Sequence, residues 1–331
     1  MFRHLKLKTT LLFFTLLIAV SVSSEGAFAA CDLNTVGTHV SGQVTIGPLR
    51  AAVTANRDVT TCDVTGISVM RQVVTSATFN QDISGWNLSN ATSTFYMFQN
   101  ASEFNQDISG WDVGNVTTME GMFGGASKFN QNINTWDVSK VTTMQQMFST
   151  ASSFNQNLNG WDVTNVTNMQ YMFLSASNFN GNISSWDVSN VTNMVRMFDG
   201  TAFNQNIGSW DVSKVTAMWS MFQNASAFNQ NLENWDVRSV TSTGLDGILK
   251  NSNISNSNYD ALLIGWSGNT FLNSGVTMTV GSVKYSVGAA QTARNYLTGT
   301  KGWTITDGGS SGNNAPVANA GPDQAVASGA S

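Results

Sequence analysis

The chain has 331 residues, a formal net charge of −5 at pH 7 and only 11% charged residues. An acidic chain with so few cationic side chains repels nucleic acid and anionic lipid surfaces, so we exclude both as partners. Asparagine, serine, threonine and glutamine supply most of the polarity instead. One apolar run near the N-terminus is too short to span a membrane as a stable helix, and no longer run follows it, so we expect no membrane insertion.

Residues 1–29 have the pattern of a signal peptide. A basic start precedes the apolar stretch from Leu11 to Val22, and small residues at Ala27 and Ala29 occupy the two positions that a signal peptidase reads. The sequence therefore predicts a bacterial chain that is exported and is either secreted or held at the cell surface.

The chain contains only two cysteines, Cys31 and Cys62, both near the predicted mature N-terminus. In an oxidising compartment two such residues pair, so we predict a disulfide between them. Two alternatives stay open: both thiols are free, or Cys31 carries a lipid. Lipid attachment prefers an aliphatic residue three positions earlier, where this chain has Phe28.

The phrase Phe-Asn-Gln-Asp-Ile-Ser-Gly-Trp-Asp-Val recurs along the chain at steps of 25, 25, 25, 25, 24 and 25 residues. Its first residue falls at Phe79, Phe104, Phe129, Phe154, Phe179, Phe203 and Phe228. A short, strict period predicts a solenoid, because one such unit cannot bury its apolar face without stacking on its neighbours. The single 24-residue step marks a one-residue deletion near Thr201.

Within a repeat, two apolar patterns follow each other. The run Trp111-Asp112-Val113 alternates apolar and polar residues, which predicts a short strand. Apolar residues then recur at steps of three and four from Val116 to Ala126, which predicts a short helix. Thr117 with Glu120 three residues later matches a capping box at its start. Because helices are bulkier than strands, we expect the stack to curve with the strands on the concave side.

The repeat, with its Met-x-x-Met-Phe run, resembles that of the BspA-like leucine-rich-repeat family of bacterial surface proteins over roughly residues 62–250. Residues 315–324 resemble the first strand of a PKD-type domain. The resemblance implies an α/β repeat solenoid: a right-handed, leucine-rich-repeat-like stack with a short parallel strand and a short helix in each 25-residue coil. It also implies adhesion or protein binding at the cell surface without catalysis, within a larger modular protein. Phe, Met and Trp stand where ordinary leucine-rich repeats have Leu.

These observations predict five segments along the chain. They are a signal peptide at 1–29, an N-terminal cap with a degenerate half-repeat at 30–78, a seven-repeat solenoid at 79–252, a C-terminal cap at 253–307, and a linker with the start of a truncated PKD-like domain at 308–331.

Rows of identical polar residues are the first candidates for a binding site. The aspartates are Asp112, Asp137, Asp162, Asp187, Asp211 and Asp236. They form either an acidic stripe that binds a cation or a partner, or a series of Asx-turns in which each carboxylate accepts backbone N–H groups. One Asp per coil lacks the dense oxygen ligands of a calcium site, so we predict no metal and no cofactor.

Two further rows have simpler structural interpretations. Asn80 and its equivalents can bond along the stack. Thr117 and its equivalents can cap the predicted helices, and a flat Thr array that orders water, as on an ice-binding face, is the alternative. Trp219 breaks the repeat pattern and is a candidate surface anchor.

The chain lacks the residue patterns that are typical of a catalytic site. After export the chain would have one histidine, His39, and it carries no nucleophile elbow, phosphate-binding loop or metal-ligand cluster. We therefore predict a non-enzymatic interaction module that binds an extracellular protein or another cell-surface partner through a curved polar face. The alternative is a carbohydrate-binding component of an exported protein that handles polysaccharides, with a glycan as the partner.

Overall fold

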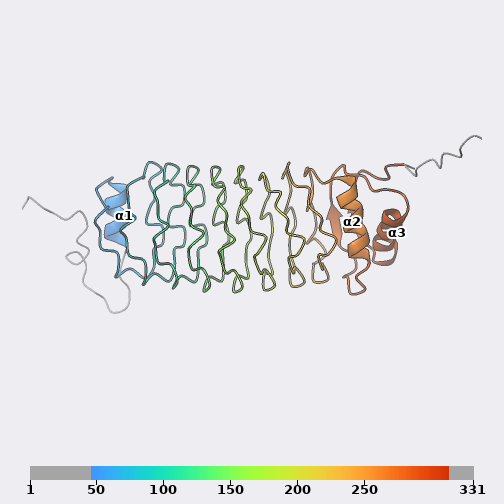
Figure 1. The fold of residues 1–331 in the computed structure, drawn as a ribbon, viewed down its shortest axis with the longest axis horizontal. Helices are drawn as coiled ribbons and strands as arrows, with labels where there is room; N and C mark the ends of the chain where they lie inside the picture. Colours follow the sequence, from blue (N-terminus) through green and yellow to red (C-terminus); the bar gives the residue numbers. More distant parts are fainter. Residues whose placement is uncertain (1–45, 313–331) are drawn as a thin grey trace, which may run out of the picture.

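The computed structural model describes residues 46–312, in which the repeats lie side by side along one long axis (Figure 1). Isolated parallel β-bridges join equivalent residues of successive coils, for example Thr118 with Thr143 and Thr143 with Asn168. The repeat architecture predicted from the period is therefore present, and each coil lies directly against the next.

The local structure inside the coils differs from the prediction. Within residues 46–312 the regular elements lie only at the two ends of the stack. They are α1 (Gly47–Thr54), α2 (Asn256–Ser267), β1 (Thr277–Thr279), α3 (Ala289–Asn295), the π-helix η1 (Tyr296–Thr300) and β2 (Thr304–Thr306). The predicted strand at Trp111-Asp112-Val113 and the predicted helix from Val116 to Ala126 are both wrong. With no helix to cap, the proposed capping box of Thr117 and Glu120 is also wrong.

Overlapping tight turns take the place of the helix. The N–H of Met122 donates to the carbonyl of Met119 at 3.2 Å, and the N–H of Gly124 donates to the carbonyl of Gly121 at 3.0 Å. Gly121 and Gly125 have φ of 59° and 76°, in the left-handed region that interrupts a right-handed helix. Turns of this length repeat apolar positions at nearly the helical spacing, which is why the sequence pattern resembled a helix.

The turns leave alternate N–H groups free to bond the next coil. The pairs are Met119 with Thr143 at 3.2 Å, Gly121 with Gln145 at 2.8 Å, Phe123 with Met147 at 2.8 Å and Gly125 with Ser149 at 2.7 Å, each N–H donating to the carbonyl of the second residue. In an α-helix these groups would bond within the helix and could not reach a neighbouring coil. The turn conformation therefore satisfies the backbone and joins the coils at once.

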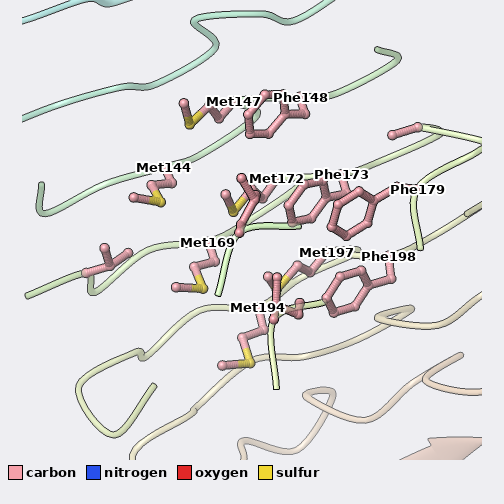
Figure 2. Packing of buried hydrophobic residues seen from close by; sticks show 14 of the residues in the cluster. Met144, Met147, Phe148, Met169, Met172, Phe173, Phe179, Met194, Met197 and Phe198 are labelled. Atoms are coloured by element: carbon pink, nitrogen blue, oxygen red, sulfur yellow. The ribbon is translucent and has the colours of Figure 1, made fainter. Parts of the chain in front are cut away.

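Aromatic and methionine side chains form columns that run through the stack. Figure 2 shows the repeated methionines and phenylalanines one above the other, each contributed by a successive coil. The rings of Phe148 and Phe173 stack with centroids 5.5 Å apart, and within one coil Phe173 lies 3.7 Å from Phe179. All three are fully buried, and burying one such side chain contributes about 1.5–3 kcal/mol. No coil can bury these rings alone, which makes stacking obligatory.

The predicted curvature is not seen in Figure 1, where the stack runs straight across the view. Without helices on one side, nothing wedges the coils apart. The handedness of the coils stays a prediction.

A degenerate coil closes the N-terminal end of the stack. The N–H of Cys62 donates to the carbonyl of Val59 at 3.2 Å, as that of Trp86 donates to Ile83 in the next coil at 3.0 Å. Cys62 therefore occupies the Trp position, where it is buried. Helix α1 lies at this end of the stack and buries Leu49 and Val53.

Several N-terminal predictions fall on residues outside 46–312. The signal peptide and Cys31 lie there, so the disulfide between Cys31 and Cys62 stays a prediction. A lower melting temperature under reducing conditions would be its signature.

Helix α2 takes the place of a further coil at the C-terminal end. Its N-cap residue Ser255 accepts the N–H of Asn258 through its hydroxyl oxygen at 3.2 Å. The indole of Trp266 donates to the carbonyl of Leu232 at 2.9 Å, which continues the bonding of the Trp column. Strands β1 and β2 pair in parallel and extend the line of bridges, since Met278 of β1 also bridges Leu245.

A buried ion pair fixes the outer part of this cap. Arg294 of α3 donates to both carboxylate oxygens of Asp307, at 2.7 and 3.2 Å, and the hydroxyl of Tyr259 in α2 donates to the same carboxylate at 2.9 Å. Residues 313–331, which carry the PKD-like segment, lie outside the described part. None of the helices between residues 46 and 312 combines the length and apolarity that a membrane crossing requires.

One coil departs from the common bonding pattern. The indoles of Trp111, Trp136 and Trp161 donate to a carbonyl of the preceding coil at 2.9–3.1 Å. In contrast, the indole nitrogen of Trp210 is buried and is without a partner among the described residues. Trp210 belongs to the coil that follows the 24-residue step, so the deletion coincides with a local loss of fit.

We predict that removing one whole coil leaves a folded, shorter protein. Deletion of residues 129–153 joins Lys128 to Phe154, and the inter-coil backbone bonds made by the turn series of the removed unit have equivalents in its neighbours. Deletion of residues 129–140 removes about half a coil and should prevent folding, because it displaces the apolar columns relative to each other. Thermal melting of both variants tests this, and equal collapse of the two would contradict an additive stack.

Candidate interaction surface

The aspartates of the row are exposed except Asp236, which is half-buried, and each member closes a turn of its own coil. The N–H two residues later donates to Oδ1 of the aspartate, for example from Ser139 to Asp137 at 3.0 Å. The other bonds of this kind reach Asp112, Asp162, Asp187, Asp211 and Asp236 at 2.9–3.1 Å. Asn87 accepts the same bond in the first repeat at 2.9 Å, so no negative charge is needed for it. This geometry fits the Asx-turn interpretation of the row.

Hydrogen bonds also hold several of these carboxylates ionised. The Ser139 hydroxyl and N–H lower the pKa of Asp137, and Ser189 lowers the pKa of Asp187 in the same way. Burial acts to raise the pKa of Asp236, but hydrogen bonds from Arg238 and Asn269, together with the Arg238 charge, outweigh burial and leave that pKa lowered. Residues 46–312 contain no group of three or more His, Cys, Asp or Glu side chains placed to hold a metal ion.

The asparagine and threonine rows bond from coil to coil. Asn105 Oδ1 accepts the N–H of Asn130 at 2.9 Å, and the same bond recurs along the stack as far as Asn204 with Asn229 at 2.8 Å. The hydroxyl of Thr117 donates to the carbonyl of Thr92 at 3.1 Å, where the Thr117 N–H also donates at 2.9 Å. These threonines are therefore not helix caps, and their hydroxyl protons are directed into the stack.

Several surface positions change from repeat to repeat, and two adjacent ones vary among aromatic, aliphatic, polar and charged side chains. They follow Met119 and its equivalents, which are Thr94 and Leu245 in two of the coils, and we call these two positions the variable face. The first position holds Arg71, Phe95, Glu120, Gln145, Gln170, Val195, Trp219 and Asp246, and the second holds Gln72, Tyr96, Gly121, Gln146, Tyr171, Arg196, Ser220 and Gly247. Most of these side chains are half-buried or exposed. The sequence signal for them was departure from the repeat, which the prediction used only for Trp219.

The C-terminal half of the variable face carries an aromatic pair. Trp219 is half-buried and meets the ring of Tyr171 edge-on, with centroids 6.4 Å apart and planes at 79°. These residues come from coils two apart, and Val195 of the coil between them is 2% exposed. Arg196 follows Val195 and forms an ion pair with Asp199 at 2.7 Å. Trp219 is therefore one member of a fixed cluster rather than an isolated anchor.

A second aromatic cluster lies near the N-terminal end of the same face. The guanidinium of Arg71 lies 5.0 Å above the Phe95 ring, and Phe95 meets Tyr96 edge-on at 4.2 Å. The Tyr96 ring lies over Gly121, where an added Cβ would come within 1.8 Å of it. The Tyr96 hydroxyl then reaches Oε1 of Gln146 at 2.8 Å, two coils away. The absence of a side chain at Gly121 is what lets this ring lie flat along the stack.

A small polar hollow of about 110 Å³ adjoins this second cluster. Tyr96, Asn100 and Gln146 line it together with the glycines of the next coil, Gly124 and Gly125. It is below the size of about 300 Å³ at which pockets begin to enclose small molecules. This hollow adds shape to the variable face without being a separate binding site.

Away from the variable face, one large aromatic side chain is prominent. Phe271 in the cap loop is 73% exposed, and the guanidinium of Arg238 lies 5.6 Å above its ring. Asn269, two residues earlier in the same loop, donates to Asp236 at 2.6 Å and so ties this loop to the end of the aspartate row. No repeat pattern in the sequence marks Phe271, because it lies beyond the last repeat.

Two overlapping segments of the chain, residues 48–161 and 155–261, match a family model described as "Mycoplasma protein of unknown function, DUF285". The matched segments together span the N-terminal degenerate coil, all the repeats and the first half of α2. No curated protein matches the chain.

We predict that Asp137→Asn leaves the melting temperature near that of the native chain at neutral pH, because Asn87 already closes the same turn. Asp137→Ala removes the acceptor and should lower stability by up to about 1 kcal/mol. Since the folded pKa of Asp137 is lowered, its ionisation stabilises the fold above the ordinary carboxylate pKa and ceases to do so as the pH falls through the folded value.

Thermal melts between pH 2 and 7 test both points, at roughly the pH range in which aspartates titrate. A large loss of stability in Asp137→Asn at neutral pH would show that the charge itself matters to the fold.

Proposed function

We propose, for a chain that belongs to the family described as Mycoplasma protein of unknown function, DUF285, a role as an exported interaction module that binds a protein partner through the variable face. The sequence predicted binding through the aspartate row and Trp219. We now place the binding surface on the non-repeating residues, which include Trp219 but not the aspartate row.

One observation carries this proposal. Each repeated polar row is engaged within the stack: the aspartates close turns, and the asparagines and threonines bond the neighbouring coil. At the variable face, neighbouring coils instead present different side chains, with aromatic rings that remain partly accessible. Non-repeating residues on a repeating scaffold are what a specific partner can recognise.

The residue types on the variable face favour a protein partner. Tyrosine, tryptophan and arginine are enriched at protein interfaces and dominate their binding energy. Here two aromatic clusters, Phe95 with Tyr96 and Tyr171 with Trp219, each have an arginine of the same face close by, Arg71 and Arg196. The rings are held by contacts within the stack, so little side-chain entropy is lost on binding.

The cellular setting of the proposal rests on the sequence. The signal-peptide pattern at residues 1–29 supports export, and the resemblance to BspA-like leucine-rich repeats supports an adhesive role at the bacterial surface. The PKD-like segment at 315–324 supports a modular surface protein. We accordingly propose an extracellular protein as the partner, and binding rather than catalysis as the activity.

Carbohydrate binding in an exported polysaccharide-handling protein is the second candidate. The accessible ring of Trp219 favours it, because sugars stack on such rings. The aspartate row does not favour it, since each carboxylate already accepts a turn N–H group.

A paired screen tests the proposal. Residues 30–331, immobilised, are exposed to a panel of extracellular matrix proteins and to a glycan array. We expect saturable binding of a protein, weakened at least about tenfold by Trp219→Ala or Tyr171→Ala, as for truncation of interface anchors. Phe271→Ala is the matched control, because it removes an exposed aromatic ring outside the variable face and should bind normally.

Two results would contradict this assignment. Binding of glycans alone, sensitive to Trp219→Ala, would favour the carbohydrate function. Protein binding that is lost in Phe271→Ala and kept in both variable-face variants would move the site to the C-terminal cap.

A further inference from the structure

A hollow of about 330 Å³ lies where the last coil meets the C-terminal cap. It is bounded by residues 251–256 of the last coil and the start of α2, and by residues 280–283, which follow β1. Its volume falls in the range of about 300–1,000 Å³ that small-molecule sites occupy, whereas the hollow beside Tyr96 does not reach it. Junctions between structural units are also where such sites tend to occur.

The end of the coil-to-coil bonding explains why this space exists. At one position of every coil the N–H donates to the carbonyl of the next coil, as from Gly200 to Gln223 at 2.9 Å and from Asn224 to Lys250 at 2.9 Å. Asn251 is the next member of this series, with the same left-handed backbone at φ 58°. Within residues 46–312 its N–H has no such bond, because the segment that follows β1 faces it with Gly281 and not with another turn series. The hollow lies where this segment and the start of α2 take the place of the regular turns.

Several polar groups around the hollow have hydrogen-bonding capacity left. Asn251 donates through Nδ2 to Asn224 at 2.9 Å, which leaves its Oδ1 as an acceptor. Asn256 accepts the N–H of Lys284 at 3.3 Å through Oδ1, which leaves its Nδ2 as a donor. The side chains of Asn253 and Ser282 make no hydrogen bond to other residues within 46–312, and both are exposed. Free donors and acceptors thus both line one opening.

The lining also indicates which ligands the hollow does not favour. Its residues are asparagines, serines, valines and one isoleucine, and none carries a charge. An anionic ligand would call for Arg or Lys, and a cation would call for carboxylates. The aliphatic part is small, because Ile254 and Val280 are buried and only Val283 is half-buried, and it offers a narrow contact for the C–H groups of a ring. Hydroxyl groups flanked by C–H surface are the features of a neutral sugar.

We propose that this hollow, the junction pocket, is a binding site for a neutral saccharide unit. Asn253 and Ser282 hydrogen-bond its hydroxyl groups from opposite sides of the opening, and the amides of Asn251 and Asn256 complete the contacts. The site is separate from the variable face, because none of the residues that line it belongs to that face. A protein partner and a sugar can therefore be recognised by different parts of one stack.

Calorimetric titration of residues 30–331 tests this site directly. The probes are D-glucose, D-galactose, D-mannose and N-acetyl-D-glucosamine, with D-glucuronic acid as the charged comparison. We expect saturable binding of at least one neutral sugar and weaker binding of the acid. Asn253→Ala should weaken the neutral sugar about tenfold, the effect of losing one or two hydrogen bonds to a ligand. Ser282→Phe should abolish binding by filling the hollow.

The controls separate this site from other effects. Asn178→Ala removes an exposed asparagine side chain on a distant coil and should bind as the native chain does. Asn253 and Ser282 are exposed, so both variants should keep the native melting temperature. Trp219→Ala should bind the sugar normally even if it loses a protein partner. The proposal is overturned if no neutral sugar binds, if glucuronic acid alone binds, or if Asn253→Ala and Ser282→Phe both bind at native strength.

Discussion

Backbone hydrogen bonds between adjacent coils are the interaction on which the rest of this structure depends. In each coil, alternate N–H groups of the turn series point along the stack and donate to the next coil, as from Phe148 to Met172 at 2.8 Å. An unsatisfied buried N–H costs about 1–3 kcal/mol, so every coil requires a neighbour on the side to which it donates. Residues in the left-handed region, such as Gln146 and Tyr171, turn the backbone so that these N–H groups point along the stack. The hydrogen bonds to the next coil offset the conformational strain at these residues.

The other regularities follow from that spacing. Equivalent side chains fall in columns, so apolar residues stack as rings and methionines, and polar ones bond along the stack or close turns (Figure 2). A residue that serves the stack is constrained in every copy and is poorly suited to recognition. Recognition is left to the positions that the stack does not constrain, which are the variable face and the junction where α2 ends the coil series. Both sites proposed for this protein are therefore interruptions of the same regular pattern.

The period revealed the architecture because burial is a property of the whole coil. It identified the buried residues and the place of Cys62 in the Trp column without knowledge of the local conformation. It did not reveal the turns, because steps of three and four residues are common to a helix and to overlapping turns. Left-handed φ angles, as at Gly121 and Gly125, and hydrogen bonds to the next coil distinguish the turns from a helix. The sequence does not mark these positions, because non-glycine residues such as Gln146 and Tyr171 adopt the same region in other coils. The junction pocket lacked any sequence signal, since it arises from a coil that is missing.

The measurement that tests this account most directly is an NMR experiment on scalar couplings across hydrogen bonds, which identifies the carbonyl that each amide bonds. The account predicts that the Phe148 amide couples to the carbonyl carbon of Met172 in the next coil, and that the Phe173 amide couples to that of Met197. Coupling of the Phe148 amide to Met144, four residues earlier, would show a helix in each coil. That result would contradict the stack of turns from which both proposed sites were derived.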